Sequence, residues 1–103
     1  MNRFKLRLFV TGKRPNAQRA IANLKRICER DLQGMYELEI IDVLENPQLA
    51  EDERILATPT LIRDLPPPLR RIIGDLSNSQ KVLWGLELLP ILNSDQKKDI
   101  NNE

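Results

Sequence analysis

Side chains that could carry covalent chemistry are scarce in this chain of 103 residues. It has no histidine, and Cys28 is its one cysteine. These counts exclude a serine–histidine or cysteine–histidine catalytic pair, an intrachain disulfide, a CxxC redox pair and zinc-finger spacing. Cys28 falls on the apolar side of a predicted helix, which favours a small core residue over a reactive thiol. A thiol oxidoreductase that uses Cys28 is therefore the alternative function, and it requires an exposed thiol with a lowered pKa.

The acidic run of Glu51, Asp52 and Glu53 is the one sequence feature that suggests a metal site or general acid–base catalysis. Consecutive residues on a helix point in different directions, however, and nothing else in the sequence gathers these carboxylates. A solvated helix start, favoured by the helix dipole, is the better account. We therefore predict no catalytic residue, no metal and no cofactor.

The pair Arg70 and Arg71 follows three prolines and is more distinctive. Arginine side chains are frequent anchors of protein interfaces, so this pair fits a protein partner, although it fits a solvated face as well. Basic and acidic residues number 16 and 15, and this balance is not typical of a nucleic-acid-binding protein. The few aromatic residues offer no stacking platform for single strands. They are Phe4, Phe9, Tyr36 and Trp84.

The chain also lacks a membrane signal. No apolar run approaches the roughly 20 residues needed to cross a bilayer. The start alternates charged and apolar residues and has no apolar signal-peptide core. We therefore predict a cytoplasmic protein that binds neither nucleic acid nor membrane.

The elements that must position these residues are clearest in the first half. Residues 4–10 alternate with period two and predict a strand, with Phe4 on its apolar face and Phe9 among the charged residues of the other face. Residues 17–32 have helical spacing, with Asn16 as the expected cap and an end near Gly34. Residues 36–43 predict a second strand, with Ile40 on its apolar face.

Strand, helix and strand over this length predict a βαβ unit with parallel strands and a right-handed crossover. If the two strands are neighbours, Lys5 and Arg7 lie beside Glu37 and Glu39 on the polar face. Charges that merely solvate the outer face are an equally good account of the pattern.

The second half permits more than one structure. Pro47 is a good first residue for a helix, and residues 60–62 predict a short strand after an X-Pro break. Residues 69–73 fit a hairpin strand, but a helix fits better because Leu69, Ile72, Ile73 and Leu76 recur at helical spacing. Residues 77–80 have capping-box spacing before a helix, yet Trp84, Leu86 and Leu88 alternate as in a strand. We expect one domain over residues 1–92 and a polar, disordered tail over residues 93–103.

The order of these elements resembles the α/β thioredoxin fold, with Thr58-Pro59-Thr60 before a strand, then a hairpin and a terminal helix. In that fold the proline before the third strand is cis and lies against the redox loop. The corresponding loop here, residues 11–17, has no thiol.

Longer matches resemble the KaiB family of the cyanobacterial circadian clock. They include residues 41–51 (IDVLENPQLAE), 55–61 (ILATPTL), 65–68 (LPPP) and 70–77 (RRIIGDLS). Shorter matches at residues 8–16, 81–83 and 85–86 extend the resemblance over residues 4 to about 89.

This resemblance implies a protein without enzymatic activity whose partner is the hexameric ATPase KaiC. Docked as a ring of monomers, such proteins sequester KaiA and compete with a histidine kinase that has a KaiB-like domain. The resemblance also implies two folds for one chain. The ground state has the order βαββααβ and is a homotetramer (or dimer), which we expect for the free protein, and the partner-bound form has the thioredoxin-like order βαβαββα.

Carried over by position, the resemblance implies two sets of functional residues. The KaiC-facing residues are Phe4, Arg19, Glu37, Glu39, Arg54 and Arg71. The residues associated with the change of fold are Pro59, Pro66, Pro67, Pro68, Gly85 and Glu87. Clock proteins of this family have a small residue and a lysine where Glu37 and Glu39 stand, so this chain is expected to be a divergent member that binds a clock-type KaiC poorly.

Overall fold

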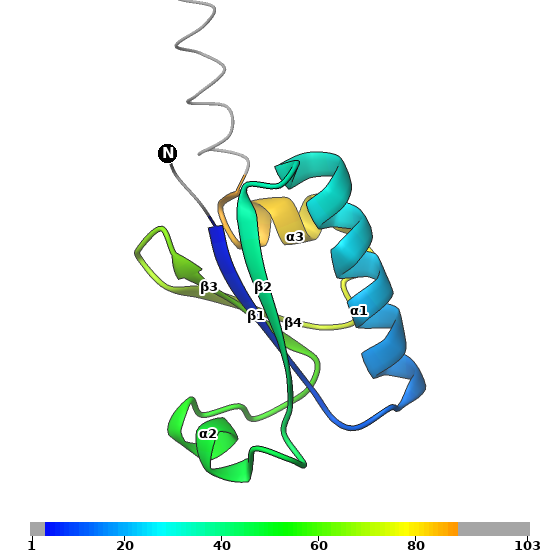
Figure 1. Cartoon of the computed structure of the whole chain (residues 1–103), viewed down its shortest axis with the longest axis vertical. Helices are drawn as coiled ribbons and strands as arrows, with labels where there is room; N and C mark the ends of the chain where they lie inside the picture. Colours follow the sequence, from blue (N-terminus) through cyan, green and yellow to red (C-terminus); the bar gives the residue numbers. More distant parts are fainter. Residues whose placement is uncertain (1–3, 89–103) are drawn as a thin grey trace, which may run out of the picture.

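The computed structural model describes residues 4–88 and gives the order βαβαββα (Figure 1). Its elements are β1 (Phe4–Val10), α1 (Pro15–Ile27) extended by the π-helical turn η1 (Cys28–Leu32), β2 (Tyr36–Asp42), α2 (Pro47–Asp52), β3 (Thr60–Leu65), β4 (Arg70–Ile73) and α3 (Ser79–Gly85). This is the thioredoxin-like order. The predicted tail at residues 93–103 and the domain boundary at residue 92 lie outside the described residues.

The four strands form one mixed sheet in the order β2-β1-β3-β4. β1 and β2 are parallel, as the βαβ pattern predicts, whereas β3 is antiparallel to both β1 and β4. The register places Lys5 opposite Glu37 and Arg7 opposite Glu39, so the predicted strand pairing is confirmed. Both outer strands, β2 and β4, have one edge without a neighbouring strand in the described sheet.

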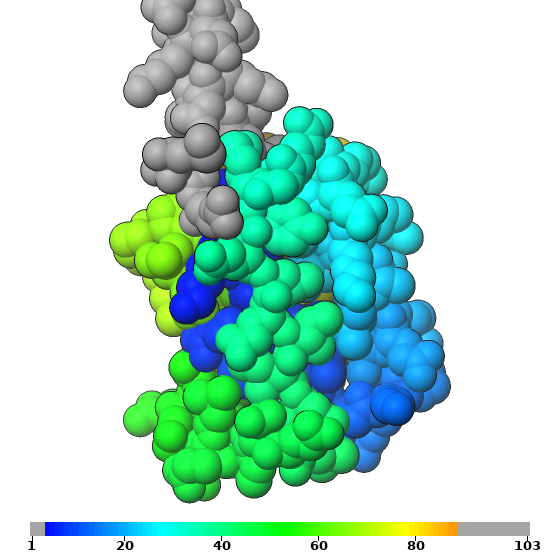
Figure 2. Space-filling view, viewed as in Figure 1, coloured from blue at the N-terminus to red at the C-terminus, as the bar shows by residue number. Residues whose placement is uncertain are grey.

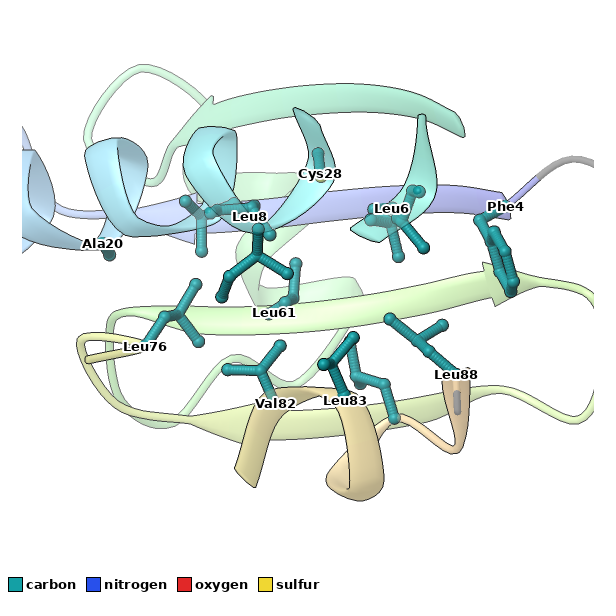
Figure 3. Packing of buried hydrophobic residues seen from close by; sticks show 14 of the residues in the cluster. Phe4, Leu6, Leu8, Ala20, Cys28, Leu61, Leu76, Val82, Leu83 and Leu88 are labelled. Atoms are coloured by element: carbon teal, nitrogen blue, oxygen red, sulfur yellow. The ribbon is translucent and has the colours of Figure 1, made fainter. Parts of the chain in front are cut away.

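One side of the sheet, here called the α1/α3 face, contains the main core (Figure 3). Leu6 and Leu8 of β1 and Leu61 of β3 project from the sheet toward the helices. Alternation along a strand puts every second side chain on this face, and the 3.6-residue period of α1 presents Ala20 and Leu24 to it. The buried residues of α3 and its C-terminal end complete the cluster; they are Val82, Leu83, Leu86 and Leu88.

The opposite side, here called the α2 face, has a smaller cluster of Phe9, Ile41 and Ile62. Two sequence expectations fail at this cluster, because Phe9 is fully buried although it shares its face with charged residues, and Ile41 rather than Ile40 is buried. The segment that includes α2 covers this end of the sheet and packs Leu49 and Ile55 against it. Alternation within one strand cannot reveal such a cover, since it comes from a later part of the chain.

Helix α1 begins after Arg14 with Pro15 in its first turn, and no side-chain hydrogen bond caps it, so the expected cap at Asn16 is wrong. The helix continues through η1 and ends at Gln33, whose φ of 43° is left-handed, next to Gly34. The predicted end near Gly34 is confirmed. Pro47 starts α2 as predicted.

The helix that periodicity favours over residues 69–76 is absent from this structure, and with it the ground-state order expected for the free chain. Residues 70–73 instead form β4, which pairs with β3 from Arg63 to Thr60. The strand turns Ile72 toward the core, whereas Leu69 and Ile73 are 45% and 61% exposed. Pairing between strands satisfies the backbone of this segment equally well, so a helical pattern of apolar residues does not decide its fold.

Residues 79–85 form the helix α3, which settles the second ambiguous segment in favour of the helix. Its cap is Asn78, whose side chain accepts a hydrogen bond from the Lys81 N–H at 3.1 Å, rather than Ser77 as the capping-box spacing suggests. Within residues 4–88, no helix combines the length and the apolar character needed to cross a membrane.

Candidate interaction surface

Arg7 organises the centre of the α2 face. Its Nε and Nη2 donate to the two carboxylate oxygens of Asp64 at 2.6 and 2.8 Å, and its Nη1 donates to Glu53 Oε1 at 2.8 Å. The guanidinium also lies 5.4 Å from the centre of the Phe9 ring. The hydrogen bond with Asp64, followed by that with Glu53, raises the pKa of Arg7 above its ordinary value. This network joins β1, β3 and the end of α2.

The network shows which partners the acidic run at residues 51–53 and the charged residues of β1 have. Glu53 serves as an ion-pair partner of Arg7 rather than as a candidate metal ligand. Arg7 stands opposite Glu39 in the register, but its ion pairs are with Asp64 and Glu53. Arg7 therefore pairs with carboxylates of other elements rather than with its neighbour on β2.

Beyond the segment of α2, this face of the sheet stays open. Side chains of β1 are visible between β2 and the α2 region (Figure 2). A shallow groove of about 520 Å³ runs here between Lys5, Arg7 and Glu39 on one side and Asp64 and Leu65 on the other. Both Glu37 and Glu39 are exposed on β2, so the predicted acidic pair lies on an accessible surface.

Arg54 and Arg71, predicted from separate parts of the sequence, are brought together. Arg71 projects from β4 onto the α2 face, and its Nη1 approaches the backbone carbonyl of Arg54 at 3.4 Å. Arg54 follows α2 and has a left-handed φ of 54°. Both side chains are exposed, so two positive charges lie at the β4 edge of the face that carries Glu37 and Glu39 at its β2 edge.

The other two predicted contact residues do not join this surface. Phe4 is 2% exposed and packs in the α1/α3 core, so it does not lie on the α2 face. Arg19 is exposed on α1, on the other side of the sheet, where its Nε lies 3.6 Å from Asp75 Oδ2. The six residues therefore divide into one buried side chain, one on α1 and four on the α2 face.

The residues associated with the change of fold mostly gather near the β3–β4 turn and the end of α3. The Thr58–Pro59 bond is cis, as expected from the thioredoxin-like order, and the Leu65–Pro66 and Pro67–Pro68 bonds are cis as well. Glu87 has a left-handed φ of 57° and forms an ion pair with Arg70. A Cβ atom at Gly85 would lie 2.8 Å from Cγ2 of Ile72, so α3 approaches β4 closely at this point.

Arg63 connects these segments, and the sequence analysis missed it. It is 2% exposed, with Nη2 donating to the Pro68 carbonyl at 2.7 Å and Nη1 to the Glu87 carbonyl at 3.4 Å. Its Nε has no partner, and burial lowers the pKa of the guanidinium. One feature of the sequence could have identified Arg63. It follows Leu61 by two residues in β3, so it lies on the apolar face, where a charged residue is unexpected.

Cys28 is poorly suited to thiol chemistry. The side chain is fully buried in the α1/α3 core, and burial raises the pKa of the thiol to about 12, with Glu29 and Asp31 adding to the shift. A thiol of this pKa is almost entirely protonated at neutral pH and is a poor nucleophile. Where thioredoxin-like proteins place the redox loop, Thr11 Oγ1 lies 2.6 Å from Thr58 Oγ1 instead.

The fold and this surface define a class: thioredoxin-fold proteins with a charged, open sheet face and a buried thiol. Solved structures agree on the fold. Mitochondrial thioredoxin 3 from Saccharomyces cerevisiae matches with a TM-score of 0.67 at 19% identity, covering 84% of this chain and 79% of that one. The N-terminal domain of Synechococcus elongatus SasA matches with a TM-score of 0.66 at 28% identity, covering 78% and 76%.

The sequence places the chain within this class. The KaiB domain matches residues 7–88. A relative named circadian clock protein KaiB3, from Synechocystis sp., is 61% identical over 90 residues, which are 87% of this chain and 88% of the relative. The chain belongs to the KaiB family, and the predicted resemblance is confirmed.

Proposed function

We propose that this chain is a non-catalytic regulator in a Kai-type system, in the cytoplasm. It binds a KaiC-like hexameric ATPase ring and modulates the phosphorylation cycle and output signalling of that ring, in a circadian rhythm or in stress adaptation. The single observation that supports this most is the contact of the Arg71 side chain with the Arg54 carbonyl, which brings two exposed arginines to an open sheet face in a KaiB-family chain whose cysteine is buried. Adjacent exposed arginines suit a protein interface.

Further partners follow from the same proposal. In its KaiC-bound form the chain would sequester KaiA and compete with a histidine kinase that has a KaiB-like domain. The free chain would be a homotetramer or dimer. The likeness to the SasA N-terminal domain supports competition for one docking site, because two proteins of one fold can present similar surfaces to the same partner. Arg63 supports a change of fold, since its carbonyl partners belong to the segments that would have to rearrange.

A binding measurement with a purified KaiC hexamer tests the proposal. Arg54→Glu combined with Arg71→Glu should weaken binding about tenfold or more, because two attractive charges become repulsive. Lys25→Glu combined with Arg30→Glu is the matched control, since it makes the same charge change at exposed positions of α1 and η1. Failure of the unmodified chain to bind the KaiC hexamer of its own organism, or equal binding by both double variants, would count against the proposal.

The acidic pair gives the opposite test. Glu37→Ala with Glu39→Lys should strengthen binding to a clock-type KaiC, and added salt should narrow the difference from the unmodified chain. Tight, salt-insensitive binding by the unmodified chain would show that these carboxylates do not oppose docking.

The alternative function is easy to test beside it. An insulin-reduction assay should give no thiol-dependent turnover, and Cys28→Ser should not change the result, because the thiol is buried and protonated. Turnover that disappears in Cys28→Ser would establish the thiol oxidoreductase.

A further inference from the structure

The position of Arg71 on the α2 face depends on the edge strand β4. In the described sheet β4 has one neighbouring strand, β3, with which it pairs from Arg63 to Thr60. It is also attached on the α1/α3 face, where Ile72 lies close to Gly85 of α3. Contacts that hold β4 and α3 in place therefore also determine where Arg71 lies.

Arg63 joins the two ends of this unit. Its Nη2 donates at 2.7 Å to the carbonyl of Pro68, in the turn that leads into β4. Its Nη1 donates at 3.4 Å to the carbonyl of Glu87, just after α3. These two hydrogen bonds, here called the Arg63 bridge, link segments that lie far apart in the sequence through separate nitrogens of one planar guanidinium.

Burial couples the two segments that the Arg63 bridge joins. Arg63 is 2% exposed, and within residues 4–88 it forms no ion pair, while the nearby carboxylate of Glu87 pairs with Arg70 instead. A buried cation without a carboxylate partner is costly unless other acceptors surround it. If one segment moved away alone, the guanidinium would lose an acceptor in a buried site, so the turn and the end of α3 should stay or move together.

The backbone at the two ends of α3 supports the same interpretation. Leu76, before the helix, and Glu87, after it, have left-handed φ values of 63° and 57°. This conformation is unfavourable for residues other than glycine. Contacts around α3 have to hold both residues in it, and the Arg63 bridge ends on the carbonyl of one of them.

We propose that Arg63 is a positioning residue for the interaction surface. The Arg63 bridge fastens the β3–β4 turn to the end of α3, and through β4 it holds Arg71 against the Arg54 carbonyl. Arg63 is itself buried on the α1/α3 side and lies outside that surface. The inference rests on the proposed function, because the surface is the one proposed to bind KaiC. The bridge belongs to the thioredoxin-like form, so it is compatible with a free chain that is a homotetramer or dimer.

Binding kinetics with the KaiC hexamer of the same organism test the proposal. Arg63→Met keeps a long side chain and removes its donors, so fewer copies of the chain should have the surface assembled. Association should be about tenfold slower, because the apparent affinity falls with the fraction of competent chains. Dissociation should change little, since no side chain on the surface is altered. Arg63→Lys keeps a donor for the two carbonyls and should recover most of the association rate.

Hydrogen exchange of the KaiC-bound chains measures the Arg63 bridge directly. In Arg63→Met the amides of β4 and α3 should exchange about tenfold faster, while those of β1 and β2 stay as they are, because only the unit next to the bridge is loosened. Leu24→Ala is the control, since it removes a buried side chain of α1 from the main core. It should keep the association rate within about twofold and should not favour exchange in β4 and α3.

The outcomes separate this role of Arg63 from the proposed function. An unmodified chain that does not bind KaiC would overturn both. If the unmodified chain binds, the role of Arg63 alone is overturned by a folded Arg63→Met that associates as fast, by equal slowing in Leu24→Ala, or by an Arg63→Lys as slow as Arg63→Met. Circular dichroism checks the folding of each variant. If Arg63→Met does not fold, Arg63→Gln, which keeps one amide donor, takes its place with an expected slowing of about threefold.

Discussion

On the α1/α3 face, apolar side chains from β1, β3, α1 and α3 form one continuous buried cluster, and the charged side chain of Arg63 is buried beside it, near the end of α3. On the α2 face the buried apolar cluster consists of Phe9, Ile41 and Ile62, and the centre of that face is an ion-pair network around Arg7. The two faces of one sheet are therefore stabilised by different forces.

The difference separates stability from recognition. Burial of apolar area is non-directional and little affected by salt, so the α1/α3 face can maintain the fold under varied conditions. Ion pairs contribute less in net terms, but they fix direction and select partners. The exposed charges of the α2 face lie on a scaffold whose core is on the other side, and substitutions among them should change binding more than folding.

The largest predicted difference between the two faces comes from shortening one leucine side chain on each. Leu8→Ala should lower the free energy of unfolding by about 2–5 kcal/mol, because Leu8 is fully buried in the main core. Leu49→Ala on the α2 face should cost about 1–2 kcal/mol, since Leu49 is only partly buried. Urea denaturation measures both values. Equal losses would mean that the α2 face contributes as much packing as the main core.

The second prediction concerns Arg7. Arg7→Met should lower the free energy of unfolding by about 1–3 kcal/mol, because it leaves the half-buried carboxylates of Asp64 and Glu53 without their cation. Added salt should reduce the loss by screening the repulsion between the two carboxylates. Urea denaturation at low and high salt provides the measurement.

Arg30→Met is the matched control for this prediction. Arg30 forms an exposed ion pair with its neighbour Asp31, so its loss should change stability much less than Arg7→Met does. If Arg7→Met lowered the free energy of unfolding as little as this control, the ion-pair network around Arg7 would not contribute to the stability of the fold.

The same contrast explains what the sequence could predict. Residues 4–10 and 17–32 have one strong period each, so the strand, the helix and the parallel pairing of Lys5 with Glu37 follow from local pattern. The proximity of Arg54 and Arg71 has no local signal. The family resemblance named both residues, and only the packing of the α2 loop against β4 brings them together.

Other features depended on contacts between distant segments. Phe9 is buried by a segment more than 30 positions later in the chain, and the strand over residues 70–73 depends on β3 as its neighbour. Residues 69–76 fit the helical period better than a strand pattern, yet residues 70–73 form a strand, because local propensity yields to tertiary context in such a case. The structural role of Arg63 could not be predicted, because its hydrogen-bond partners are backbone carbonyls. Every residue has such a carbonyl, so the sequence does not show which ones Arg63 contacts.

The smallest effect is expected from a charge on the α1/α3 side. The Oδ1 atom of Asp75 accepts a hydrogen bond from the Ser77 N–H at 3.1 Å, and bonding to Ser77, with a further contribution from Arg19, holds the pKa of Asp75 below its ordinary value. Since the folded chain favours the carboxylate, this group contributes stability above the ordinary pKa of about 4, and the contribution is lost as the pH falls through the lower pKa of the folded state. Asp75→Asn should therefore lower Tm slightly at pH 7, by less than Leu49→Ala does, and the difference should vanish in acid. Thermal unfolding of both proteins between pH 7 and pH 2 measures it. If Asp75→Asn lowered Tm at pH 7 by more than Arg7→Met does, charges would contribute as much to stability on the α1/α3 side as on the α2 face. The two faces would then not differ in the forces that stabilise them.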